Sequence, residues 1–302
     1  MMSALTVREA LERMEPEPLD HIFPASWISA NFDIWIGAEE DNHAWTQLLR
    51  ARQAFDAATG VPKEKRAMAL EELLIAEGSD WCWWYGPEHD SANRVEFDEL
   101  YRSHLANVYR FLNLAPPEEL SRPILRVTIP AELIEPSGAI EPYIDGEIGS
   151  FFEWLGAGRY RADERSGSMH GKKFLVKEVH FGSNGKNFYL RVDFHPGYEE
   201  ELGGLEVRLN LQSLDQKATG GVVLTLAGSQ AQVTGRKPEN LDAECRFARV
   251  LEARVPLEGA GIREGAGLRF QFSLWQAGLP MDAVPHQGWI EMRTTNPAEM
   301  SS

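Results

Sequence analysis

The chain has 302 residues, of which 43% are hydrophobic, and its formal net charge is -16 at pH 7. This length suggests one large domain or two of ordinary size, and the apolar content excludes a disordered chain. A surface this acidic repels nucleic acid and anionic membranes, so neither is expected as a principal partner. A neutral partner such as a sugar carries no such penalty.

The first twenty residues do not have the pattern of a secretion signal, because they lack a basic start and a long apolar core. No apolar run in the sequence is long enough to span a bilayer. Cys82 and Cys245 are far apart and form neither a disulfide framework nor a zinc site. Two reduced cysteines fit a reducing compartment, so a cytoplasmic location is expected.

Residues 1–121 are predicted to form a helical domain. Thr6 and Glu9 have the spacing of a capping box, in which two side chains bind backbone N–H groups at a helix start. Asp41 or Asn42 is expected to cap the next helix.

Two further helices are predicted in the same region. Pro62 is suited to the first turn of a helix that ends at Gly78, and Ser91 is expected to cap a long helix after it. Apolar residues recur along this last helix at steps of three and four, which is typical of one buried face: Phe97, Leu100, Tyr101, Leu105, Val108, Tyr109 and Leu112.

Residues 122–302 are predicted to form an antiparallel β-sandwich, which makes the chain an α+β protein with a helical bundle first. The segments 172–182 and 186–194 alternate apolar and polar residues on either side of a short turn, which predicts a hairpin. Further strand patterns, separated by Gly and Pro, are "ILRVTIP", "LEVRLNLQS", "GVVLTLAG", "CRFARVLEARVPL", "GLRFQFSLWQ" and "GWIEMR".

The stretch "AEGSDWCWWYGPEHDSAN", residues 76–93, combines clustered tryptophans with carboxylates. Sugars present flat C–H faces and rims of hydroxyl groups, and proteins bind them with aromatic rings beside planar polar groups. Asp80 next to Trp81 and Trp83 supplies this combination, in a loop held by a helix at each end.

A second interpretation fits the same residues, because clustered tryptophans more often fill a core than bind a ligand. In this case the indoles plug the helical layer and the carboxylates cap helices. Glu88, His89 and Asp90 are adjacent, and neighbouring residues rarely converge on one ion, so no metal site is expected. No nucleophile motif and no distinctive carboxylate pair occurs, so no catalytic residue or cofactor is assigned.

Longer segments of the chain resemble glycoside hydrolase family 57, which includes α-amylase-like enzymes, amylopullulanases, branching enzymes and 4-α-glucanotransferases. Residues 23–52, "FPASWISANFDIWIGAEEDNHAWTQLLRAR", are similar to a stretch late in its catalytic region. Residues 77–112 are similar to the last of its five conserved regions and the helix that follows. Residues 144–182 and 279–291 resemble the C-terminal β domain of long bacterial members.

The resemblance implies a retaining mechanism on α-glucans, with a Glu nucleophile and an Asp general acid carried by a β/α barrel. Both carboxylates belong to regions of the family that precede the segments found here. The chain is therefore expected to be the C-terminal portion of such an enzyme, inactive alone. Its expected partners are an α-glucan or maltodextrin and a separate chain carrying the barrel. The alternative is a non-catalytic module that binds α-glucan or another protein.

By resemblance, Asp80 and Trp83 match the fifth conserved region, where the Trp forms a substrate subsite supported by the Asp. Trp81 and Trp84 match the aromatic run of the amylase-like branch. The predicted substrate-binding residues are therefore Asp80, Trp81, Trp83, Trp84, His89 and Trp27. A missing barrel also predicts that one or more of Trp27, Trp35, Trp81, Trp83 and Trp84 is unusually exposed.

Overall fold

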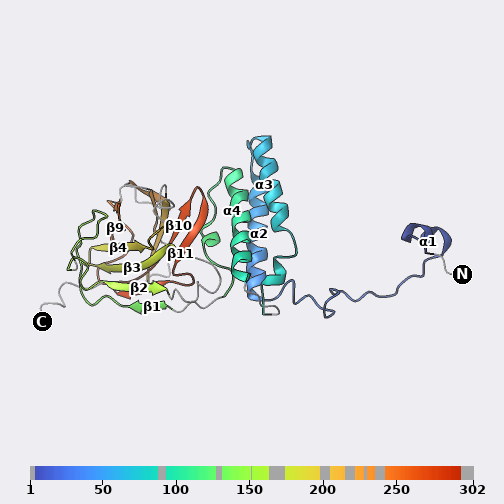
Figure 1. The fold of residues 1–302 in the computed structure, drawn as a ribbon, viewed down its shortest axis with the longest axis horizontal. Helices are drawn as coiled ribbons and strands as arrows, with labels where there is room; N and C mark the ends of the chain where they lie inside the picture. Colours follow the sequence, from blue (N-terminus) through green and yellow to red (C-terminus); the bar gives the residue numbers. More distant parts are fainter. Residues whose placement is uncertain are drawn as a thin grey trace.

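The predicted order, helices first and antiparallel strands second, is confirmed by a computed structural model of the chain (Figure 1). The residues described are 4–87, 93–126, 131–150, 152–162, 174–197, 205–214, 222–227, 230–234 and 242–293.

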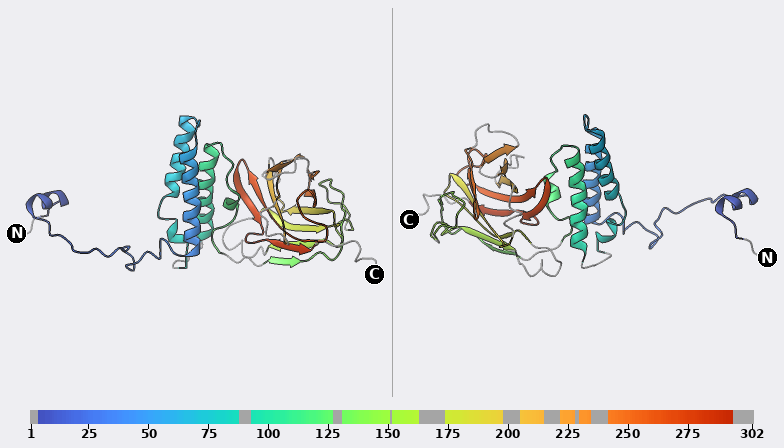
Figure 2. Two further views of the ribbon diagram at one scale, coloured as in Figure 1. Left: turned by 180° about the vertical axis from the view of Figure 1, so that it is seen from behind. Right: turned by 45° about the horizontal axis from the view of Figure 1, so that its top comes forward.

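The helices are α1 (Val7–Arg13), α2 (Glu39–Ala57), α3 (Lys63–Ala76) and α4 (Arg94–Phe111), with the short 3-10 helices η1 (Cys82–Trp84) and η2 (Glu118–Ser121). Three of them, α2, α3 and α4, lie side by side in one layer, as the two views of Figure 2 also show. The segment before α2 runs away from this layer and carries α1 at its far end (Figures 1 and 2).

The helix starts follow the sequence signals in part. The capping box of Thr6 and Glu9 is present at α1. At α2 the expected caps are wrong, because the helix begins three residues earlier, after Ala38, and places Asp41 in its first turn. Acidic side chains in the first turn of a helix interact favourably with the positive end of its dipole. Asp41 therefore stabilises the start of α2 from within the first turn, without acting as its cap.

The other two helix starts lie close to the expected positions. Pro62 is the N-cap of α3. The N-cap of α4 is Asn93, and the expected cap Ser91 lies outside the described residues.

The helical core is formed by the apolar faces of α2, α3 and α4, and the buried face predicted for α4 is wrong only at Leu100, which is 52% exposed. Its fully buried members include Ala51, Leu73, Leu105 and Val108.

The strands form two antiparallel sheets. The first has the order β1-β2-β3-β4-β9-β8, and the second has the order β11-β10-β5-β6-β7, with β12 also paired to β10. The strands of the first sheet are β1 (Ala131–Ile134), β2 (Gly158–Ala162), β3 (Val176–Ser183), β4 (Asn187–Phe194), β8 (Glu244–Phe247) and β9 (Leu251–Pro256). The strands of the second are β5 (Leu205–Ser213), β6 (Val222–Ala227), β7 (Gln230–Thr234), β10 (Gly267–Gln276), β11 (Leu279–Val284) and β12 (Ile290–Arg293).

The two sheets bury their facing sides against each other. Phe181 of β3 and Phe188 of β4 both contact Phe270 of β10, with ring centroids 5.0 Å apart in each pair. Inward and outward side chains alternate along β5, as expected for a strand with one buried face, whereas β10 is buried along most of its length. The predicted hairpin is confirmed as β3 and β4, joined by a turn at Asn184–Gly185.

Two strand predictions are wrong. "ILRVTIP" does not begin a strand, because Ile124 and Leu125 are buried in the helical core; residues 127–130 lie outside the description. "CRFARVLEARVPL" is two strands, β8 and β9, rather than one. The chain reverses at Arg249 and Val250, whose N–H groups both donate to the carbonyl of Gly146 at 2.9 and 3.0 Å. Gly146 has a φ of +79° and lies so close to Ala248 that a Cβ would be 2.8 Å from its nitrogen.

Trp275 of β10 connects the two parts of the chain. Its side chain is fully buried and belongs to the helical core although it lies on a strand. The indole Nε1 donates to Ser273 Oγ at 2.7 Å, and this hydroxyl donates to Glu118 Oε1 of η2 at 2.6 Å. The guanidinium of Arg208 lies 3.9 Å from the centre of its ring, a favourable cation–π geometry. The predicted domains 1–121 and 122–302 therefore share an apolar cluster.

Replacing this indole is expected to destabilise the whole chain. Trp275→Ala should lower the free energy of unfolding by about 3–5 kcal/mol, because it leaves a large cavity between α4 and β10. The matched control is Trp27→Ala, since Trp27 is 86% exposed and should change stability by less than about 0.5 kcal/mol. Urea unfolding followed by circular dichroism measures both, and equal effects of the two variants would contradict the packing role of Trp275.

Candidate functional site

Trp81 packs within the helical layer, as expected if the clustered tryptophans fill a core and do not bind a ligand. Its Nε1 donates at 2.8 Å to the carbonyl of Ile75 in the last turn of α3, which also accepts from the N–H of Gly78 at 3.1 Å. Its half-buried ring contacts the rings of Phe97, Tyr101 and His104, with centroids 5.6–6.0 Å apart. Trp81 is therefore a plug between α3 and α4.

The other tryptophans of the loop form a partly open surface. Trp84 stacks on Phe97 with ring centroids 5.0 Å apart, and Trp83 contacts Trp35 at 6.2 Å. Trp45, which is 38% exposed, donates its Nε1 to the carbonyl of Trp35 at 2.7 Å. We call the five residues Trp35, Trp45, Trp83, Trp84 and Phe97 the aromatic edge.

The remaining predicted site residues are not gathered at the aromatic edge. Asp80 is exposed at the start of the loop. Trp27 is 86% exposed on the N-terminal segment and takes part in none of the ring contacts found within the described residues. His89 lies outside the described residues. Of the five tryptophans expected to be left open by a missing barrel, Trp27 is strongly exposed, while Trp35, Trp81, Trp83 and Trp84 are half-buried.

A buried carboxylate holds the tryptophan loop in place. Asp98 of α4 accepts hydrogen bonds from the hydroxyl of Tyr85 at 3.1 Å, from the backbone N–H of Ile124 at 3.0 Å and from Arg102 Nε at 2.8 Å. Arg102 also donates to the carbonyl of Leu120 at 2.9 Å. Burial, reinforced by the charge of Asp98, raises the pKa of Tyr85 well above its usual value, which keeps its hydroxyl a donor.

A second carboxylate attaches the loop to α2. Glu40 Oε2 accepts from the backbone N–H of Gly86 at 2.8 Å and from Arg94 NH2 at 3.1 Å. Asp98 and Glu40 therefore position the loop, although neither was singled out from the sequence.

Neither cysteine is available for catalysis. Both are free and buried. Burial raises the pKa of Cys82 to about 11 and that of Cys245 to about 12, so neither thiol forms the reactive thiolate near neutral pH.

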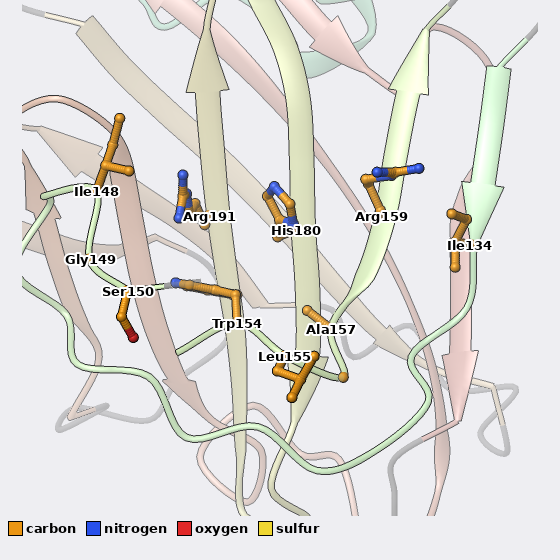
Figure 3. A pocket seen from close by; sticks show the side chains of 11 residues that line it. Ile134, Ile148, Gly149, Ser150, Trp154, Leu155, Ala157, Arg159, His180 and Arg191 are labelled. Carbon is orange, nitrogen blue, oxygen red and sulfur yellow. The ribbon is translucent and has the colours of Figure 1, made fainter. Parts of the chain in front are cut away.

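A separate cavity of about 570 Å³ lies over the outer side of the first sheet (Figure 3). Its walls come from β1 to β4 and from the segment 148–157 that crosses them. The lining residues are Ile134, Ile148, Gly149, Ser150, Trp154, Leu155, Gly156, Ala157, Arg159, His180 and Arg191.

The strand register sets the polar side of this cavity. Arg159 pairs with His180 across β2 and β3, and His180 pairs with Arg191 across β3 and β4. Directly opposite residues share a face, so the three side chains form one row, which Figure 3 shows beside Trp154. The neighbouring members of this row are Ile134 of β1 and Glu252 of β9.

Each basic side chain in the row has a carboxylate neighbour. Arg191 donates from Nε and NH2 to the carboxylate of Asp193 at 2.7 and 3.1 Å. Arg159 NH2 donates to Glu132 at 3.3 Å. His180 Nε2 lies 2.9 Å from Glu178. Burial lowers the pKa of His180 despite the nearby Asp193 and Glu178 charges, so its ring is neutral near pH 7.

The crossing segment is pinned by a buried carboxylate, Glu252. Oε1 accepts from the indole of Trp154 at 3.2 Å, and Oε2 accepts from the N–H groups of Asp145 and Gly146 at 3.2 and 3.0 Å. Glu153, which the sequence pairs with Trp154, accepts from the N–H of Tyr143 at 3.1 Å and so anchors the same segment.

This cavity was not predicted from the sequence, because its polar row depends on the pairing of three strands. The one signal was the Glu-Trp pair within "SFFEWLGAG", whose indole forms a wall.

No group of three metal-ligating side chains occurs among the described residues, and the Glu88, His89 and Asp90 run lies outside them. No helix within the described ranges is long and apolar enough to cross a membrane. No family profile, curated protein or solved structure matches the chain.

Removing the Asp98 carboxylate is expected to release the tryptophan loop. Asp98→Ala should cost about 3–5 kcal/mol of stability, because it leaves the guanidinium of Arg102 buried without its charge partner. Asp80→Ala, at the exposed start of the same loop, should change stability by less than about 0.5 kcal/mol. Thermal and urea unfolding compare the two, and a small cost for Asp98→Ala would contradict its anchoring role.

The protonation of Glu252 gives a pH test. Burial raises its pKa in the folded chain above the ordinary value of 4.5, and this outweighs its three hydrogen bonds. The folded state then binds the proton more tightly than the unfolded state, so this contribution to stability is complete below the ordinary pKa. It is lost as the pH rises through the folded pKa.

Glu252→Gln removes the titration but keeps the shape. The stability of the wild type relative to Glu252→Gln should therefore be greater at about pH 4 than at about pH 7. Urea unfolding at both pH values measures the difference. A difference that increases with pH would show that the hydrogen bonds outweigh burial.

Proposed function

We propose that the helical part of this chain forms one wall of an α-glucan site in an enzyme similar to glycoside hydrolase family 57. The observation that carries the proposal is the aromatic edge, where Trp45 is partly exposed and Trp35, Trp83 and Trp84 are half-buried. Half-open indoles beside carboxylates suit the flat faces and hydroxyl rims of glucose units. Asp80, exposed at the start of the same loop, is the proposed polar partner of the sugar.

The N-terminal segment supports contact with a further protein part. Large apolar side chains remain strongly exposed along it: Leu19, Ile22, Phe23, Trp27 and Ile36. Exposed apolar surface of this extent is typical of a surface that another protein element covers. We assign that element to a β/α barrel carrying the catalytic carboxylates, following the resemblance in residues 23–52.

In this proposal the described residues hold the glucan and the barrel cleaves it. The chain by itself therefore binds α-glucan without hydrolysing it. Free buried cysteines and the acidic surface are in keeping with a cytoplasmic glucan enzyme.

The test is affinity electrophoresis of the chain in gels containing soluble starch. Starch should retard the wild type, and Trp83→Ala should weaken the retardation about tenfold in apparent dissociation constant, as expected for about 1.4 kcal/mol of lost ring contact. Trp289→Ala is the matched control, because Trp289 is a half-buried indole on the β part, packed under Arg269.

Two results would contradict the proposal. If starch does not retard the wild type, the chain does not bind α-glucan. If Trp83→Ala and Trp289→Ala lose the same amount of affinity for starch, the aromatic edge is not the binding site. If the chain alone releases reducing sugar from starch, the proposal that it only binds the glucan and that a separate barrel cleaves it is wrong.

A further inference from the structure

We propose that the cavity over the first sheet is a second saccharide site, which binds a short neutral sugar independently of the aromatic edge. It goes beyond the proposed function, because it rests on the walls of the cavity and not on the family resemblance.

The cavity has the size and the mixed lining of a small-ligand site. Its volume of about 570 Å³ lies within the range of roughly 300–1,000 Å³ that is common for such sites. One side is apolar, with Trp154 and Leu155 from the crossing segment and Ile134 from β1. A sugar ring can lay its C–H face against this side.

The other side offers hydrogen bonds to hydroxyl groups. Among the described residues, Arg191 bonds through Nε and NH2 and Arg159 bonds through NH2, so the NH1 group of each remains as a donor toward a ligand. A neutral His180 that donates from Nε2 to Glu178 leaves Nδ1 as an acceptor. Donors and an acceptor in one row suit adjacent hydroxyl groups, each of which both donates and accepts.

The charges favour a neutral ligand over an anion. The two guanidinium groups face three carboxylates, those of Glu132, Glu178 and Asp193. An anion such as phosphate would have to displace or oppose these carboxylates, and the net charge of -16 adds to the repulsion. A sugar instead extends the existing hydrogen bonds without removing the ion pairs.

The walls are held before any ligand arrives. Glu252 fixes both the indole of Trp154 and the backbone at Asp145 and Gly146. Fixed groups lose little conformational entropy on binding, which favours recognition of a small ligand.

The experiment is titration of the chain with maltose, maltotriose, cellobiose and inorganic phosphate, followed by calorimetry and by the indole N–H NMR signal of Trp154. We expect a sugar to shift this signal. Arg159→Ala should weaken that binding about tenfold, through loss of a charged donor. Arg161→Ala is the matched control, because Arg161 is exposed on the same strand and does not line the cavity, and its affinity should be unchanged.

A second variant covers a folding defect in Arg159→Ala. Leu155→Ala shortens an exposed wall residue and should weaken sugar binding about threefold through lost apolar contact. The Trp83→Ala variant should leave this binding unchanged. Maltose binding without cellobiose binding would assign the site to α-linked glucose, and the reverse to β-linked glucose.

The other outcomes overturn the proposal. They are an absence of any sugar-induced shift of the Trp154 signal, binding of phosphate alone, or equal affinities of Arg159→Ala, Leu155→Ala and the wild type. If Trp83→Ala abolishes all sugar binding while the cavity variants do not, the second site fails and the aromatic edge stands. If only the cavity variants lose binding, the aromatic edge fails and the second site stands.

Discussion

The buried carboxylate of Asp98 is the contact on which the helical part depends. It lies on α4 and holds Tyr85 from the tryptophan loop, Arg102 from its own helix and the backbone of Ile124 beyond η2. The tryptophan loop and the segment beyond η2 therefore both meet α4 at the two oxygen atoms of this carboxylate. A buried charge is tolerated only where such partners surround it, so the position of each segment is fixed by the others.

The β part uses the same device at Glu252 and combines it with apolar packing. Glu252 fixes the segment that crosses the first sheet, while Phe181, Phe188 and Phe270 close the space between the sheets. Trp275 then extends from the second sheet into the helical core. Buried polar groups determine where the loops lie, and aliphatic and aromatic side chains together provide the burial that holds the layers together.

Local patterns in the sequence predicted the elements that depend on neighbouring residues. The capping box of Thr6 and Glu9 and the β3–β4 hairpin are set within a few residues of chain, and both are confirmed. The strands β1 and β2 were missed because they are short and pair with each other across a long intervening segment, whereas β7 and β11 were missed although they form hairpins with the neighbouring β6 and β10. "ILRVTIP" failed for a related reason: its first residues have a strand composition, but the helical core buries them.

The same distinction applies to the candidate sites. The aromatic composition of residues 76–93 was visible in the sequence, but not that Trp81 would cap α3 while Trp83 and Trp84 stay partly open. The cavity was not predictable, since Arg159, His180 and Arg191 become neighbours only through strand register.

Gly146 makes backbone hydrogen bonds to two separate parts of the first sheet. Its N–H donates to Glu252 and its carbonyl accepts from the N–H groups of Arg249 and Val250 in the chain reversal between β8 and β9, so one residue joins the cavity wall to the edge of the sheet. An edge strand is the part of a sheet that frays most readily and that is most open to pairing with other chains. Because both sets of bonds involve this one residue, loosening of the β8 edge and loosening of the cavity wall are expected to be coupled.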